Sequence, residues 1–263
     1  NFKDDYFQIL ILAFFSFLIG FSYPYLQYGV DGGLVLSGLI KYPDLNSPMG
    51  YYYLNSWTSI HQISSLLLQI GLSAETLSKL FMIFVTVFFS FGVFLFTFSL
   101  IQKKNLSLFI AITSIILGKN FGDTDYPSLI FSEHTYGMLS LATFTLILGF
   151  IANKNILIAS IVTMILISIH PVIGVWTLLF VTISFYYLKI YNNFSKDIYR
   201  GMLIGIFFVT TSFLIYYSNT IEKVPYDYNL FLNYLANWDG HRIISKTIHY
   251  EYLAKTLFLC FLC

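Results

Sequence analysis

Residues 28–73 read YGVDGGLVLSGLIKYPDLNSPMGYYYLNSWTSIHQISSLLLQIGLS and lie between two strongly apolar segments. The stretch carries an acid, Asp31, a run of three tyrosines at 51–53, Trp57 and His61. It is too polar to cross a bilayer and too aromatic for an ordinary solvated loop. Tyr and Trp rings favour the headgroup level of a membrane. The composition therefore predicts short helices that lie along a membrane surface.

The overall composition predicts an integral membrane protein. Hydrophobic residues make up 57% of the chain and charged residues only 10%, whereas soluble domains carry about 25% charged residues. The net charge of +1 offers no basic face of the kind that neutralises nucleic-acid phosphates. We therefore expect membrane lipid as a partner and no nucleic acid.

Apolar segments recur along the whole chain and predict an all-α fold. They lie at 7–23, 77–101, 106–117, 136–151, 156–169, 172–188 and 202–217, and an eighth begins at 253. We expect a polytopic helix bundle of about seven complete spans with a truncated eighth. The eighth stops at residue 263, although a span needs about 20 residues. Residues 1–263 are thus expected to be a single transmembrane domain, the N-terminal part of a longer protein.

The loops between these segments alternate in length and charge. The loops 102–105, 152–155 and 189–201 are short and basic, and with Lys3 they hold seven of the 14 Lys and Arg residues. By the positive-inside rule they face the cytoplasm together with the N-terminus. The loops of the other parity then face outward with all five histidines and ten of the 13 acids. This asymmetry favours a site that works at one membrane face, although long loops also collect polar residues for no functional reason.

Two segments are short for a membrane span. Residues 106–117 and 156–169 would rise about 18 and about 21 Å as helices, against a hydrocarbon core of about 30 Å. If both start at the inner interface, the outer residues that follow them, Asp123 and His170 among them, lie in a recess below the outer surface. Tilt or bilayer thinning would remove this recess.

Several outer residues are candidates for chemistry. Asp31 is followed by two glycines, and it is either a catalytic base or the N-cap of a helix that begins at Gly32. Asp123 and Asp125 form a DxD triplet, which suits a metal or pyrophosphate as well as an Asx-turn. No nucleophile elbow, P-loop, dinucleotide fingerprint or zinc helix occurs.

Two histidines and an arginine complete the candidate set. His134 follows Glu133 at the start of an apolar segment, where the pair suits a metal, a proton shuttle or a helix cap. His170 precedes Pro171, so it lies at a turn between two helices, where it either binds a phosphate or satisfies a helix end. Arg242 offers a planar fork for phosphate.

The order of features in residues 1–101 resembles the GT-C class of membrane glycosyltransferases: a first span, an acid just beyond it, a long outer loop with Tyr-rich juxtamembrane helices and a long second span. The resemblance implies a polyprenyl-phosphate-linked sugar donor and transfer at the extracytoplasmic face, here of a bacterial inner membrane with a role at the cell envelope. Asp31 matches the acid of the first outer loop in that class. Departures are that Asp31 is not part of an acidic pair and that the DxD-like triplet lies in the second outer loop, so a divalent cation at Asp123 and Asp125 is an open expectation.

On this hypothesis Asp31 takes the proton of the acceptor hydroxyl, and His170, Arg242 and His134 contact phosphate or substrate. Tyr52 and Trp57 hold the lipid and the sugar. Other classes stay open: a polysaccharide polymerase or ligase, a non-catalytic scaffold, and a transporter or lipid flippase. The mid-segment polar residues available for transport are Thr86, Ser90, Thr143 and Thr163.

Overall fold

The computed structural model describes residues 2–23, 30–41, 53–54, 56–117, 135–187, 189–218, 229 and 233. Within these ranges the regular elements are helices and no strand occurs, as the sequence predicts. The helices are α1 (Phe2–Ser22), α2 (Asp31–Leu36), α4 (Ser59–Gln69), α5 (Ala74–Ile101), α6 (Lys104–Leu117), α7 (Thr135–Ala152), α8 (Ile156–Ile169), α9 (Pro171–Tyr187) and α10 (Ile190–Ser218).

The chain divides into two compact units, residues 1–41 with 56–220, and residues 42–55 with 221–263. All the helices named above belong to the first unit, and only that unit is described further. The single domain expected for 1–263 stays a prediction.

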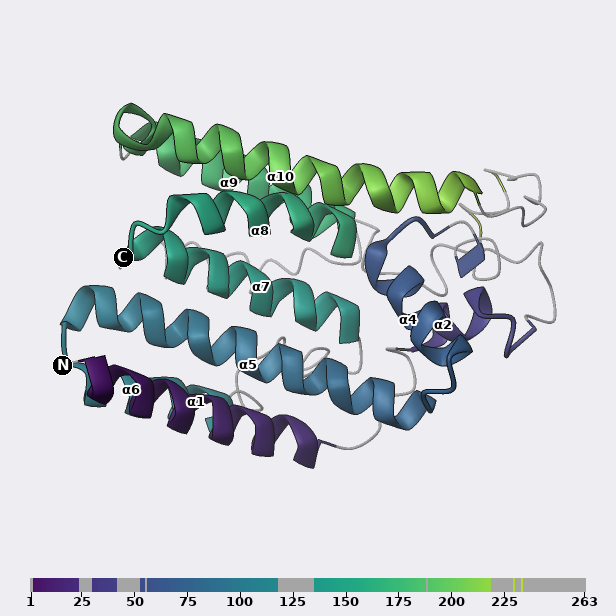
Figure 1. The fold of residues 1–263 in the computed structure, drawn as a ribbon, viewed down its shortest axis with the longest axis horizontal. Helices are drawn as coiled ribbons and strands as arrows, with labels where there is room; N and C mark the ends of the chain where they lie inside the picture. Colours follow the sequence, from purple (N-terminus) through teal and green to yellow (C-terminus); the bar gives the residue numbers. More distant parts are fainter. Residues whose placement is uncertain are drawn as a thin grey trace. The chain divides into compact units, whose positions relative to one another are not determined.

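The long helices of this unit lie side by side in a row (Figure 1). Helices α1 and α6 both pack on α5, α5 packs on α7, α7 on α8, and α9 and α10 both pack on α8. Consecutive helices run in opposite directions because short connections join α5 to α6, α7 to α8 and α9 to α10 at one end of the row. We call this end, which carries Lys103, Lys154 and Lys189, the basic end. The short helices α2 and α4 lie at the opposite end, which we call the α4 end (Figure 1).

Small residues let the central helices approach closely. A Cβ atom on Gly92 of α5 would lie 2.5 Å from the carbonyl carbon of Thr145 on α7, and one on Gly149 would lie 2.8 Å from the backbone oxygen of Gly92. The hydroxyls of Ser16 and Ser90 join α1 to α5 at 2.7 Å. Contacts between small residues and hydroxyl pairs across helices are typical of helices that pack in membranes.

Most helix bounds agree with the apolar segments of the sequence, but the loop predicted at 189–201 is wrong. Nearly all of it belongs to α10, which has a kink at Phe194 (φ −126°, ψ 21°). Ile190, Phe194 and Ile198 recur every four residues and pack in one core cluster with α8 and α9. This spacing gives the segment an apolar stripe in spite of its polar residues.

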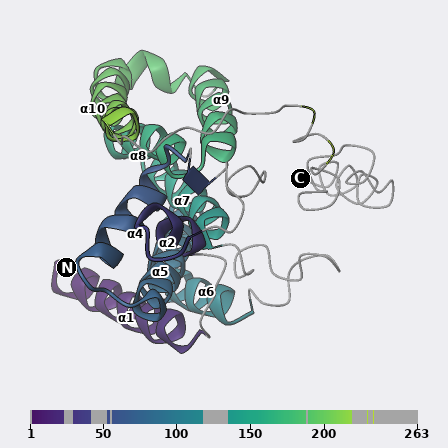
Figure 2. The same cartoon turned by 90° about the vertical axis from the view of Figure 1, so that its right-hand side faces the viewer.

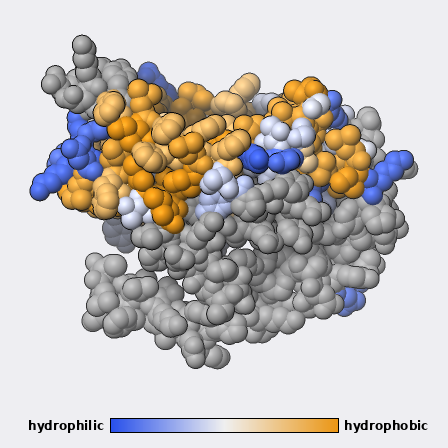
Figure 3. Space-filling model, turned by 90° about the horizontal axis from the view of Figure 1, so that it is seen from below, coloured by the Kyte–Doolittle hydropathy of each residue, from blue (hydrophilic) through white to orange (hydrophobic). Residues whose placement is uncertain are grey.

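Two of the described helices, Ala74–Ile101 and Asn192–Ser218, are long and apolar enough to cross a membrane. The other long helices are apolar but shorter. Large hydrophobic side chains lie exposed along α1, α9 and α10, and Figure 3 shows mainly apolar residues over the described part of one face, with hydrophilic residues toward its two ends. Exposed apolar surface on this scale indicates contact with lipid or protein.

Candidate functional site

Helix α2 places Asp31 at the α4 end of the bundle. Asp31 is the first residue of α2, and Val30 holds the N-cap position without a side-chain hydrogen bond, so Asp31 is not itself the cap. Its side chain is partly buried, and burial raises the pKa of the carboxyl. Among the described residues no cation forms an ion pair with it. A carboxylate with these properties is a stronger base than one in water.

The glycines after Asp31 serve helix packing. A Cβ atom on Gly32 would lie 2.6 Å from Cδ2 of His61 on α4, and one on Gly33 would lie 2.5 Å from Cβ of Ser64. Only residues without a Cβ let α2 lie this close to α4. The imidazole of His61 therefore fixes the position of the backbone next to Asp31.

His61 is buried, with 3% of its surface exposed, and two hydroxyls hold its ring. Its Nδ1 lies 2.6 Å from Oγ of Ser56 and 3.0 Å from Oγ1 of Thr58, and the two hydroxyls lie 3.0 Å apart. Burial, and secondarily the positive charge that His170 carries at low pH, lower the pKa of His61 to about 4. His61 is thus neutral at physiological pH, and His170 lies near enough to influence it.

His170 lies at the predicted turn between α8 and α9, and Pro171 begins α9 as expected. The backbone of His170 is extended (φ −145°, ψ 99°). Its Nδ1 accepts a hydrogen bond from the backbone N–H of Ile173 at 3.4 Å, which leaves the proton of the neutral ring on Nε2. His170 therefore satisfies the start of α9, and its Nε2–H is the donor that a phosphate would use.

A set of polar contacts attaches α4 to α8 and α10 at this end. The hydroxyls of Ser59 on α4 and Ser168 on α8 lie 3.0 Å apart. Oγ of Ser212 on α10 donates to the backbone oxygen of Trp57 at 2.6 Å. The Trp57 ring stacks on Phe213, with ring centroids 4.2 Å apart and planes 12° apart. One face of the indole predicted to hold substrate is thus used to anchor the start of α4.

Asp31, His61 and His170 meet at the α4 end, although 139 positions separate the first from the last. The other predicted site residues, Tyr52, Asp123, Asp125, His134 and Arg242, lie outside the described residues. In the part of the chain that the structure describes, no group of three His, Cys, Asp or Glu side chains gathers to hold a metal ion. The divalent cation expected at Asp123 and Asp125 stays a prediction.

The sequence analysis does not assign His61 to the site, although a local signal marks it. Thr58 is the N-cap of α4 and His61 stands three residues later, which is the spacing of a capping box with His in place of Glu. Tyr23, just after α1, is also buried in the core cluster that contains α2 and α4 residues. Its burial raises the pKa of its hydroxyl to about 12, so it stays protonated.

No protein-family model matches this chain, and neither a curated protein nor a solved structure matches it significantly.

Proposed function

We propose that this chain belongs to a polytopic membrane glycosyltransferase that moves a sugar from a polyprenyl-phosphate-linked donor to an acceptor at the extracytoplasmic face. The observation that carries the proposal is Asp31, a partly buried carboxylate with a raised pKa that buried His61 fixes in position, at the same end of the bundle as His170. Such a carboxylate suits general-base chemistry better than a structural role.

Membrane embedding is supported by the exposed apolar side chains along α1, α9 and α10 and by the two helices of spanning length. The shorter apolar helices cross with local thinning of the bilayer. Lys103, Lys154 and Lys189 at one end favour a cytoplasmic basic end, and hence an N-terminus in the cytoplasm. The α4 end then faces outward, in a bacterial inner membrane.

In the proposed reaction the acceptor hydroxyl gives its proton to the Asp31 carboxylate as its oxygen bonds to the anomeric carbon of the sugar. The bond between that carbon and the phosphate oxygen breaks, and the lipid phosphate leaves with the electron pair. His170 donates its Nε2–H to a phosphate oxygen as negative charge develops there. His61 is a positioning residue that acts through the backbone of Gly32.

The transporter alternative loses the residues that support it. The hydroxyls of Thr143 and Thr163 donate to backbone oxygens of their own helices at 2.7 Å. Thr86 donates to the backbone oxygen of Ser16 at 2.8 Å, and Ser90 pairs with the Ser16 hydroxyl. These groups hold helices together and line no polar path.

The Asp31→Asn variant tests the proposal in the full-length protein. We expect sugar transfer from a polyprenyl-phosphate hexose donor to fall by about 10²- to 10⁴-fold, the usual contribution of a general base, with unchanged amounts of protein in the membrane. Glu75→Gln is the matched control, because Glu75 is an exposed acid that pairs with Lys79 at 3.1 Å. Full transfer activity in Asp31→Asn would refute the role of Asp31.

A further inference from the structure

A cavity of about 370 Å³ lies among α8, α9 and α10. It exists because α10 packs along α8 over much of its length but contacts α9 only slightly. Figure 2 shows α9 and α10 diverging on either side of α8. The wall is almost wholly apolar and includes Leu178, Val181 and Phe185 of α9 and Ile198 and Met202 of α10. The cavity lies toward the basic end, away from Asp31 and His61.

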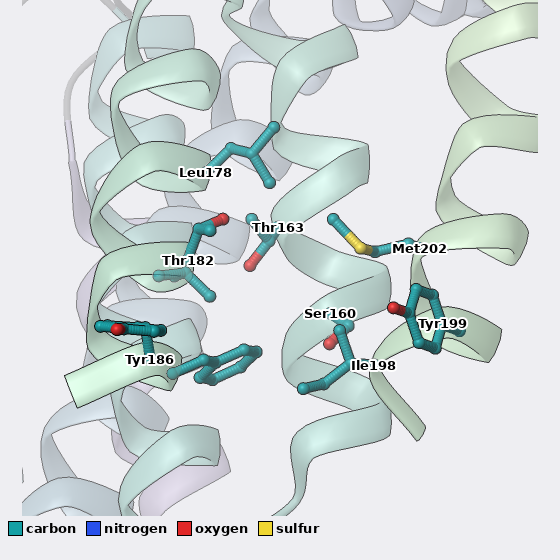
Figure 4. A pocket seen from close by; sticks show the side chains of 10 residues that line it. Ser160, Thr163, Leu178, Thr182, Tyr186, Ile198, Tyr199 and Met202 are labelled. Atoms are coloured by element: carbon teal, nitrogen blue, oxygen red, sulfur yellow. The ribbon is translucent and has the colours of Figure 1, made fainter. Parts of the chain in front are cut away.

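One polar side chain in the cavity wall has no hydrogen-bond partner. Ser160 of α8 is only 3% exposed, and its hydroxyl makes no hydrogen bond within the described residues. Thr163, one turn further along α8, also lines the cavity, but its hydroxyl donates to the backbone oxygen of Ala159. Figure 4 shows both side chains on the cavity side of α8. A buried hydroxyl without a partner is costly, so Ser160 indicates a ligand that carries an acceptor.

Basic side chains flank the end of the cavity at which Tyr199 of α10 lies. Lys196 and Arg200 stand three positions before and one after Tyr199, so all three lie on neighbouring positions of one helix surface, and both cations are exposed. Lys189 follows Tyr186, the cavity residue at the end of α9. Asp197 is the one acid among these residues, so the net charge around this end of the cavity is positive.

We propose that this cavity binds an anionic phospholipid. One acyl chain enters between α9 and α10, its ester carbonyl accepts a hydrogen bond from Ser160, and the phosphate lies against Lys196 and Arg200. Ser160 stands four residues after Ile156, the first residue of α8, which is about 6 Å along the axis. This depth agrees with the interfacial layer of about 5 to 8 Å on each side of the hydrocarbon core. The inference rests on the proposed membrane embedding but not on the transfer reaction.

The test measures how tightly the purified full-length protein retains lipid, by native mass spectrometry with a diacyl phosphatidylglycerol probe. Ser160→Ala is expected to weaken retention about two- to tenfold, the usual effect of one hydrogen bond. Thr163→Val is the matched control and should retain lipid normally, since its hydroxyl is already bonded within α8. The double variant Lys196→Gln, Arg200→Gln should lose the preference for phosphatidylglycerol over phosphatidylcholine. The double variant Lys103→Gln, Lys154→Gln at the same end should keep it.

A photoactivatable acyl chain gives a second readout that does not depend on variants. Crosslinks to residues 178–186 and 198–202 are expected from the phospholipid probe. Crosslinks spread over α1 and α9 alike, equal retention in Ser160→Ala and the native protein, or equal retention of a free fatty acid would overturn the proposal. Asp31→Asn should retain the lipid fully, so a failure of this proposal and a failure of the proposed enzyme activity give different results.

Discussion

His61 shows how one buried side chain controls the geometry of the candidate site. Its Nδ1 is held by the hydroxyls of Ser56 and Thr58, and the opposite edge of its ring packs on the backbone of Gly32. An imidazole in this position cannot gain a proton without losing hydration that the protein does not replace. His61 is therefore a neutral spacer between α2 and α4, and the position of Asp31 depends on it.

The lowered pKa of His61 predicts a pH-dependent stability. In the unfolded chain His61 takes up a proton near pH 6.5, whereas in the folded protein it does so only near pH 4. Unfolding therefore becomes more favourable as the pH falls from 6.5 to 4, by about 3 kcal/mol in total, and this contribution is fully present only above pH 6.5. Melting temperatures of the native protein and of His61→Gln between pH 4 and 7.5 check this. A native pH slope that persists unchanged in His61→Gln would assign it to other groups.

Gly32→Ala is predicted to destabilise the protein by about 1 to 3 kcal/mol, because the added Cβ overlaps the His61 ring. The double variant Gly32→Ala, His61→Ala should be less destabilised than the sum of the two single variants, since the smaller side chain makes room for the methyl group. Chemical denaturation of the four proteins measures this coupling. Additive effects would show that Gly32 and His61 do not contact each other.

At the scale of elements, the sequence predicts helices well where sharp signals delimit them. Residues 156–169 are predicted and observed with identical bounds, because Asn155 and Pro171 stand on either side. The first half of α10 is missed because Asn192, Asn193 and Lys196 lower its average hydropathy. The apolar repeat at Ile190, Phe194 and Ile198 becomes visible only when periodicity is weighed instead of average hydropathy.

The contact of α5 with α7 depends on Gly92, which yields a prediction at this scale. Gly92→Ala brings a Cβ within 2.6 Å of the backbone nitrogen of Leu146, and backbone atoms cannot move aside as a side chain can. We expect a loss of about 1 to 3 kcal/mol of stability, measured as a lower melting temperature. Phe84→Leu, on an exposed position of the same helix, is the control and should change little. Equal melting temperatures for Gly92→Ala and the native protein would contradict the close packing of α5 on α7.

At the scale of the whole molecule, the sequence predicts which residues share an end of the bundle but not how they touch. Asp31 and His170 are assigned to one face from the alternation of loop charge, and the antiparallel helices bring them to the same end. The burial of His61 and the use of Trp57 as an anchor on Phe213 depend on contacts between segments more than 100 residues apart, which no local pattern encodes. The roles of Tyr52, Asp123, Asp125, His134 and Arg242 stay predictions.

The central claim is that Asp31, His61 and His170 lie at the outer end of a membrane-spanning bundle, and sided thiol labelling tests it most directly. Lys41→Cys at the α4 end and Lys154→Cys at the basic end are introduced separately into a protein whose Cys260 and Cys263 are replaced by Ser. Both lysines are exposed. With a membrane-impermeant thiol reagent on intact cells, position 41 should react at once, and position 154 only after permeabilisation. The reverse pattern, or reaction of both positions in intact cells, would contradict the orientation and with it the proposed site of sugar transfer.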